Sequence, residues 1–515
     1  MEDMLEPPVL EALTELGYRR PRQVAGQIQV LRERVWSPLG RRAPTWQSDL
    51  ARYVIQSCAQ APDPDQAFSF WTRLINVVGD RPGFYKMLYE NPHATRLLLH
   101  VFGSSQFLGS IIIREPNVIE YLLGSGTMAV VRDRDAIRTE LDRRLQAITD
   151  RSHRTGRIRR FQQEETLRIA LHEVAGACRI DETVGQLSIL AEVCVEAVLA
   201  EVYSHLQSSQ SGTEDWPAFD ALPFTVLAMG KLGGRELGFG SDLDIIFVYE
   251  PLEEVGLDHS MYAKIAQRLV RQLSSVSEQG KLYEVDTRLR PSGRQGTLVV
   301  SLDAFREYHE ESDDLWERQA LIRARPITGP ARLRRDILVV REKRIFEDEL
   351  PGDARERLCE MRGKIFAHAG REDDSMNIKT APGGLVDLEF VTQYLQLVHG
   401  RAAAGSGDVA QSSGDSTDLQ SGLRTQQTVA ALEVLADAPP RDDVDFAQLL
   451  DDYRTLRRVE ARLRMADLRD HNRVPADPER RRLVARRLGY QGEDAAEQLT
   501  SDLEALTGRV QSVFE

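Results

Sequence analysis

The spacing of apolar residues predicts that most of the first 220 residues are helical. Along residues 159–202, apolar side chains recur at the three- and four-residue intervals of a buried helix face. Two such stripes are Leu167, Leu171, Val174 and Cys178, then Leu190, Cys194, Ala197, Val198 and Val202. We interpret them as core residues. Residues 1–220 are therefore predicted to form a helical domain that orients a catalytic unit or docks partners, with a polar linker at 207–216.

At residue 224 the pattern changes to short apolar runs typical of strands. The expected strands are Phe224–Met229, Leu243–Tyr249, Leu282–Leu289 and Thr297–Val300. An amphipathic helix at Met261–Val276 separates two of them, and another helix is expected at Ser312–Arg325. On that second helix, Arg318 and Arg325 share a face that either reaches a triphosphate or an acidic partner, or is simply exposed and charged. Residues 221–330 should thus form a small α/β domain.

Helical spacing returns from about residue 331 to the end. The last helices carry an apolar stripe and, outside it, arginines such as Arg457. We expect these arginines to lie on a face exposed to solvent. Residues 401–422 are small and polar, so we expect a flexible loop there. The fold class is therefore α+β and mostly helical, with the small α/β domain flanked by helical domains at 1–220 and 331–515.

The chemistry of the chain concentrates in FTVLAMGKLGGRELGFGSDLDIIFVY, residues 224–249. Side chains alternate faces along a strand, so Asp242 and Asp244 project from one face. Two carboxylates that close repel each other unless a cation lies between them. Oxygen ligands favour a hard ion such as Mg²⁺ with substrate phosphates, and glycines before them bring backbone N–H groups up to a phosphate. These features indicate metal-assisted nucleotidyl transfer.

A third acid follows in LYEVDTRL, residues 282–289. On an alternating strand, Asp286, Arg288 and Arg290 share one face. Asp286 completes a two-metal site and acts on the attacking nucleophile in this interpretation, while the two arginines hold phosphate oxygens. The alternative for these residues is a solvated strand face with local ion pairs.

The balance of acidic and basic residues narrows the classes of binding partner. Acids outnumber bases by 80 to 66, which gives a formal charge of −14. That balance disfavours nucleic acid, whose binding depends on basic surface, and an anionic membrane. We see no apolar run approaching the ~18 residues of a membrane-spanning helix.

The cysteines and the N-terminal residues favour a cytoplasmic protein. Four scattered cysteines in a chain of this length suit a reducing compartment, and none forms a C-x-x-C pair that would favour zinc. The start, MEDMLEPPVLEAL, lacks the basic and apolar regions of a signal peptide.

The glycine turn, the Asp-x-Asp pair and the third acid resemble the nucleotidyltransferase superfamily of DNA polymerase β. Lys231 stands where that superfamily has its second small residue, so Ser241 is expected to supply the hydroxyl instead. Longer motifs are similar to the family of bifunctional glutamine synthetase adenylyltransferase/adenylyl-removing enzymes: MGKLGGREL (229–237), SDLD (241–244), YEVDTRLRPSG (283–293), WERQALIRAR (316–325) and IKTAPGGLVDLEFVTQYL (378–395).

Members of that family carry two nucleotidyltransferase halves, and this chain, with one Asp-x-Asp module, resembles the adenylylating half. The resemblance implies transfer of AMP from ATP to a tyrosine of glutamine synthetase, which regulates nitrogen assimilation. It implies that Asp242, Asp244 and Asp286 hold Mg²⁺ and are catalytic. The residues implied to bind ATP are Gly230, Lys231, Gly233, Gly234, Ser241, Arg288 and Arg290.

Other interpretations of the same residues stay open. The carboxylates would equally support phosphorolytic removal of AMP from adenylylated synthetase, with ADP as the product. The helical flanks would suit a non-catalytic regulatory module that binds the synthetase or a PII-type signal protein. Transfer of nucleotides to RNA is disfavoured by the acidic balance.

Overall fold

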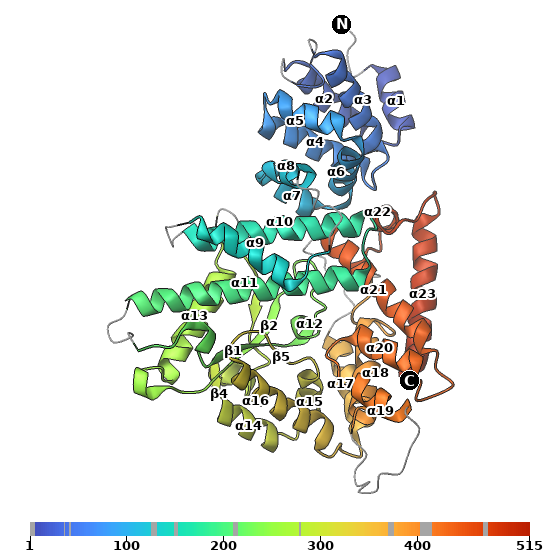
Figure 1. Ribbon diagram of the computed structural model, residues 1–515. Helices are drawn as coiled ribbons and strands as arrows, with labels where there is room; N and C mark the ends of the chain where they lie inside the picture. The colour runs from blue at the N-terminus through green and yellow to red at the C-terminus, as the bar shows by residue number, and fades with distance from the viewer. Residues whose placement is uncertain are drawn as a thin grey trace.

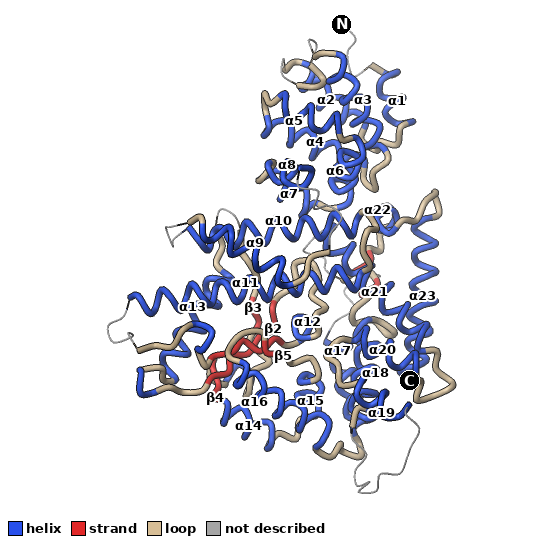
Figure 2. The backbone as a smooth tube through the Cα atoms, viewed as in Figure 1, coloured by secondary structure: helices blue, strands red, loops and turns tan. Residues whose placement is uncertain are grey.

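The computed structural model describes residues 6–34, 37–40, 43–124, 131–148, 153–209, 215–277, 280–368, 375–401, 415–466 and 472–515. Helices dominate these residues, and one small mixed sheet lies near the centre of the molecule (Figure 1). Figure 2 shows its strands surrounded by helices. The expected α+β, mostly helical class is confirmed.

The N-terminal helices form a lobe at one end of the molecule (Figure 1). Several of them begin with proline, whose fixed φ suits the first helical position and whose missing N–H costs nothing there. The lobe comprises α1 (Pro7–Glu15), α2 (Pro21–Arg32), α3 (Thr45–Ala59), α4 (Pro64–Val78), α5 (Pro82–Glu90), α6 (Pro92–Ser104), α7 (Gln106–Arg114) and α8 (Asn117–Gly124).

Three helices connect this lobe to the sheet: α9 (Arg134–Gln146), α10 (Arg154–Val174) and α11 (Ile180–Ser209). The apolar stripe predicted for α11 is buried as expected, including Leu190, Cys194 and Val202. Contrary to our expectation, α11 does contain an 18-residue window long and apolar enough to cross a membrane. Because 78% of that window is buried inside the protein, α11 is accounted for as a core helix.

The sheet has the strand order β3-β2-β1-β5, and β4 also pairs with β2. β1 and β2 are antiparallel, with Phe224 opposite Tyr249, whereas β3 and β4 run parallel to β2. The strands are β1 (Phe224–Ala228), β2 (Leu243–Tyr249), β3 (Val285–Asp286), β4 (Val299–Ser301) and β5 (Arg325–Pro326).

Helices cover both faces of the sheet, as the alternation of β2 requires. Ile245 and Phe247 belong to the core shared with α11 and with α13 (His259–Ser274). Ile246 and Val248 belong to a second core on the opposite face. That face is covered by α14 (Leu302–Glu311) and α16 (Ala331–Glu342), with α15 (Leu315–Leu321) nearby.

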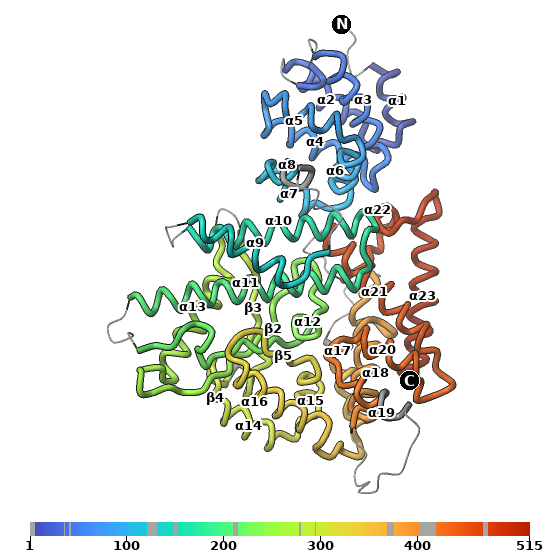
Figure 3. The backbone as a smooth tube through the Cα atoms, in the orientation of Figure 1, coloured from blue at the N-terminus to red at the C-terminus, as the bar shows by residue number. Residues whose placement is uncertain are grey.

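A C-terminal bundle with its own apolar core packs beside the sheet domain. Figure 3 shows this orange-to-red segment lying against α10 and α11, which are far away in the sequence. Its central helix α21 contacts α11 and also α6 and α7 of the N-terminal lobe. The bundle comprises α17 (Ala354–His368), β6 (Met376–Asn377), α18 (Leu385–His399), α19 (Asp415–Gly422), α20 (Thr428–Asp437), α21 (Phe446–Ala466), β7 (Arg473–Val474), α22 (Pro478–Leu488) and α23 (Ala495–Phe514).

Three expected elements differ from the structure. The strand at 282–289 shrinks to Val285–Asp286, because the Asp286 side chain accepts the backbone N–H of Arg288 and starts a turn. The helix at 312–325 shrinks to α15, since Arg325-Pro326 pairs with β1 instead. Of the expected flexible loop at 401–422, residues 402–414 lie outside the described residues, and 415–422 form α19.

Candidate active site

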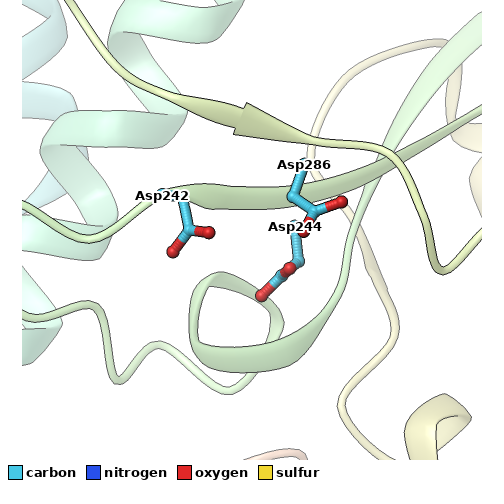
Figure 4. A group of neighbouring side chains, drawn as sticks. All are labelled: Asp242, Asp244 and Asp286. Atoms are coloured by element: carbon cyan, nitrogen blue, oxygen red, sulfur yellow. The ribbon is translucent and has the colours of Figure 1, made fainter.

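The three aspartates predicted from the sequence lie together at one edge of the sheet. Parallel pairing places Asp244 on β2 directly opposite Asp286 on β3, and Asp242 immediately precedes β2. One carboxylate oxygen from each residue lies within 4.8 Å of the others. Figure 4 shows the three side chains on the same side of the sheet, above the short α12 turn. We call these residues the aspartate triad.

The triad is electrostatically unbalanced. Burial raises the pKa of Asp244 to about 6, and the neighbouring carboxylates of Asp242 and Asp286 add to that effect. Asp286 is paired with a cation, because the Arg288 Nε lies 2.9 Å from its Oδ1 and 2.7 Å from its Oδ2. Asp244 has no comparable ion pair with a described residue.

A cavity of about 710 Å³ opens beside the triad. It is polar, with acids and arginines on its walls, so it suits a charged ligand. Its lining residues are Gly240, Asp242, Glu284, Val285, Asp286, Thr287, Arg288, Arg290 and Arg464. Two of the expected ATP-binding residues, Arg288 and Arg290, are among them. Arg290 also donates to the Thr287 and Gly296 carbonyls, which fixes its direction.

The glycine turn after β1 is α12 (Gly230–Gly233), and its glycines serve different contacts. Gly230 has φ +50°, and a Cβ there would lie 2.3 Å from Asp244 Oδ2, so only glycine fits against the triad. A Cβ on Gly233 would lie 1.8 Å from the Arg323 carbonyl oxygen. Gly234 similarly approaches the Gln426 carbonyl. The last two glycines therefore pack against later segments and do not line the cavity.

Lys231 is directed away from the cavity, into the contact between the sheet domain and α21. Its Nζ lies 2.5 Å from Glu460 Oε1, and its side chain is 15% exposed. Burial lowers the pKa of Lys231 to about 8, while Glu460 opposes that shift. Ser241 is buried next to Asp242, and its hydroxyl accepts a hydrogen bond from Arg464 Nη1 at 3.2 Å.

Lys231 belongs to a group of buried charges that the sequence did not suggest. Arg323 lies 3.3 Å from Glu236 and 3.4 Å from Glu389, and Arg457 lies 2.6 Å from Glu460. We call the following residues the seam cluster: Lys231, Glu236, Arg323, Glu389, Arg457, Glu460 and Arg464. It joins the sheet domain to the C-terminal bundle.

The expectation that Arg457 lies on a solvated face is therefore wrong, since this residue is 3% exposed. A signal was present in the sequence: Arg457, Glu460 and Arg464 recur at the i, i+3, i+7 spacing of one helix face. Asp387, another acid of the 378–395 motif, accepts hydrogen bonds from Arg362 and from the Gly383 N–H and so has a structural role.

Arg318 and Arg325 do not reach the cavity. Arg318 is buried and donates to the carbonyls of Ile345, Asp348 and Glu349. Arg325 donates to the Gly233 carbonyl at 3.0 Å and to Glu192 at 2.6 Å. Both residues hold segments of the fold together.

A mixed sheet with a glycine turn, an Asp-x-Asp strand and a third aspartate on the parallel neighbour defines a nucleotidyltransferase-type domain. Comparison with protein families agrees. Residues 95–339 match the family model described as glutamate-ammonia ligase adenylyltransferase, and residues 347–515 match the one described as GlnD PII-uridylyltransferase. The chain thus combines a domain of the glutamate-ammonia ligase adenylyltransferase family with one of the PII-uridylyltransferase type.

Similar curated proteins carry the name bifunctional glutamine synthetase adenylyltransferase/adenylyl-removing enzyme. The one from Thioalkalivibrio sulfidiphilus is 33% identical over 406 residues, which cover 75% of this chain and 41% of that protein. The one from Aromatoleum aromaticum is 34% identical over 358 residues, covering 67% and 36%. The one from Burkholderia mallei is 32% identical over 412 residues, covering 77% and 43%. The chain therefore spans less than half the length of these relatives.

Proposed function

We propose that the protein transfers AMP from ATP to a tyrosine hydroxyl of glutamine synthetase, with Mg²⁺ as cofactor and pyrophosphate as the second product. The observation that carries this proposal is the aspartate triad, whose carboxylate oxygens gather within 4.8 Å beside a polar cavity. The acceptor is suggested by the family model over residues 95–339 and by the names of the relatives.

The triad fits a hard divalent cation. All three ligands are carboxylates, and burial, together with the neighbouring carboxylates of Asp242 and Asp286, raises the pKa of Asp244. Such an ion, when bound, would neutralise phosphate charge and acidify an attacking hydroxyl. Asp242, Asp244 and Asp286 would hold it.

The other residues of the site have roles that follow from their positions. Gly230 leaves space for the Asp244 carboxylate, and Ser241, next to Asp242, accepts a hydrogen bond from Arg464. Arg288 and Arg290 line the cavity and would neutralise the departing pyrophosphate. Asp286 would accept the tyrosine proton, because it faces the cavity at the end of β3.

Two further points belong to the proposal. The match of residues 347–515 supports a PII-type signal protein as a regulatory partner. The described cysteines are all free thiols, which supports a cytoplasmic location.

The experiment is incubation of the protein with purified glutamine synthetase, Mg²⁺ and ATP labelled on the α-phosphate. Label on the synthetase together with released pyrophosphate is the expected result, and Asp244→Asn is the inactive control. The relatives' names include adenylyl removal, so the second candidate is phosphorolysis. Phosphate-dependent ADP release from adenylylated synthetase, without transfer from ATP, would establish that second activity and overturn the first.

A further inference from the structure

The cations that the sequence offers for a triphosphate are largely engaged elsewhere. Lys231 is paired with Glu460 in the seam cluster. Arg288 holds Asp286, and Arg290 donates to carbonyls of its own loop. Arg288 and Arg290 line the cavity, but each also holds a protein acceptor, so only part of their donors is open to a nucleotide beside Asp242.

Arg464 of α21 faces the same cavity from the other domain. Its side chain is 9% exposed, and its Nη1 donates to Ser241 Oγ and to the Phe239 carbonyl, both at 3.2 Å. Its Nε is buried, lies 3.4 Å from Glu460 Oε1 and makes no hydrogen bond. No hydrogen bond joins Nη2 to a described residue either. Nη1 therefore fixes the guanidinium in place, while the N–H groups of Nη2 are not used by the described residues.

The Arg464 side chain packs close to the backbone of Gly238 in the sheet domain. An ideal Cβ on Gly238 would lie 3.6 Å from Arg464 Cδ and 3.4 Å from Ser241 Oγ, so the side chain runs directly over the loop that leads to Asp242. A planar guanidinium with fixed orientation and unused N–H groups is well suited to phosphate oxygens.

The balance of charges in the seam cluster also favours binding of an anion near Arg464. Within the seam cluster, the cations Lys231, Arg323, Arg457 and Arg464 outnumber the carboxylates Glu236, Glu389 and Glu460. A further cation, Lys379, follows β6, and its charge lowers the pKa of both Asp244 and Glu389. The seam between the sheet domain and the bundle therefore carries an excess of positive charge, and Arg464 is its member on the cavity wall.

We propose that Arg464 binds a phosphate oxygen of the nucleotide beside Asp242, so that the C-terminal bundle completes the site that the sheet domain begins. This proposal rests on the proposed function for the identity of the nucleotide. It assigns a ligand-binding role to residues 347–515, which match a different family model from the residues that carry the triad.

The test measures binding of Mg·ATP and of Mg²⁺ with inorganic triphosphate to the full chain, by calorimetry and without any acceptor protein. Arg464→Gln should weaken both by about tenfold or more, the effect of losing a charge-assisted hydrogen bond. Arg464→Lys should restore part of the affinity, because lysine keeps the positive charge but lacks the paired N–H donors of the planar guanidinium. In the transfer assay the KM for ATP should rise more than kcat falls, with the KM for the synthetase unchanged.

Arg458→Gln is the matched control, since Arg458 is an exposed arginine on the same helix. It removes the same charge and should leave the affinity for both ligands unaltered. Melting temperatures of all variants are measured alongside. Should Arg464→Gln fail to fold, Arg464→Lys provides the comparison, because it retains a cation for Glu460.

The possible failures are distinguishable. If the wild-type protein binds ATP and Arg464→Gln binds it equally well, Arg464 is structural and the inference is overturned while the proposed function stands. If Arg464→Gln weakens binding no more than Arg458→Gln does, the inference is likewise overturned. If the wild-type protein binds neither ATP nor triphosphate, the proposed function fails, and the inference fails with it.

Discussion

Two groups of charged residues lie on either side of the short α12 turn, and they are organised in opposite ways. The aspartate triad gathers three like charges, and Asp244 has no strong counter-ion among the described residues. The seam cluster is more deeply buried, yet each of its carboxylates lies within 3.5 Å of a cation. Paired charges such as these belong to the architecture, whereas a concentration of like charge persists only where a ligand is to neutralise it.

The largest effect expected from this contrast is on catalysis. Asp244→Asn removes one of the repelling carboxylates, so the fold should be kept or slightly stabilised, while AMP transfer should fall by at least about a thousandfold. The labelled-ATP assay and a thermal melt measure the two effects. A variant that transfers AMP at a near-normal rate would remove the triad from the mechanism.

Breaking a pair in the seam cluster should instead reduce the stability of the fold. Glu460→Gln leaves Lys231 and Arg457 without their shared carboxylate, which should lower the free energy of unfolding by about 3–5 kcal/mol. Urea titration at neutral pH measures this loss. The control is Glu433→Gln, because Glu433 is 49% exposed and pairs with Arg454 at the surface, where a pair contributes only about 0–1 kcal/mol. Equal losses in the two variants would contradict the assignment.

Acid should narrow the difference in the free energy of unfolding between wild type and Glu460→Gln. Burial raises the pKa of Glu460, but Lys231, Arg457 and Arg464 together lower it well below its usual value of 4.5. The unfolded chain therefore binds the proton more readily, so this contribution to stability is complete above pH 4.5 and is lost as the pH falls below it. The gap between the two proteins should narrow by roughly 1.4 kcal/mol per pH unit in that range. Urea titrations at pH 7, 4 and 3 check it, and a constant gap would refute the linkage.

The smallest expected effect is stabilisation by the cation. Mg²⁺ at several times its dissociation constant should raise the melting temperature of the wild-type protein by about one to three degrees, because it binds the folded triad alone. Asp242→Asn should lose most of that shift, whereas Glu433→Gln should keep it. A shift that survives in Asp242→Asn would mean that Mg²⁺ binds elsewhere.

The local parts of this organisation could be predicted from the sequence. The bounds of β2 match the expected Leu243–Tyr249, because an uninterrupted apolar run after Asp-Leu-Asp leaves little choice. The gathering of the triad followed from strand alternation and the order of three short motifs. Gly230 was expected near a phosphate, and the structure places it against Asp244 itself.

Long-range partners could not be predicted. Lys231 was expected to bind phosphate because it lies in the glycine turn before Asp242, whereas its partner Glu460 lies 229 residues further on. Arg325 was assigned to a helix face, but its neighbour Pro326 favours an extended backbone, which β1 stabilises. Arg464 was not singled out from the sequence, because its contacts, Phe239 and Ser241, come from a distant segment.

The strand β3 pairs with β2 over only two residues, and a backbone bond from the Leu243 N–H to the Glu284 carbonyl at 2.9 Å anchors it. Because neighbouring positions on a strand face opposite sides, a slip of one residue would turn Asp286 away from Asp244. Leu282 and Tyr283, which lead into β3, are buried in the core, so packing as well as pairing holds the register of this strand. Among natural or engineered homologues, insertions and deletions of a single residue between Leu282 and Val285 should therefore be eliminated, while apolar substitutions at Leu282 are tolerated.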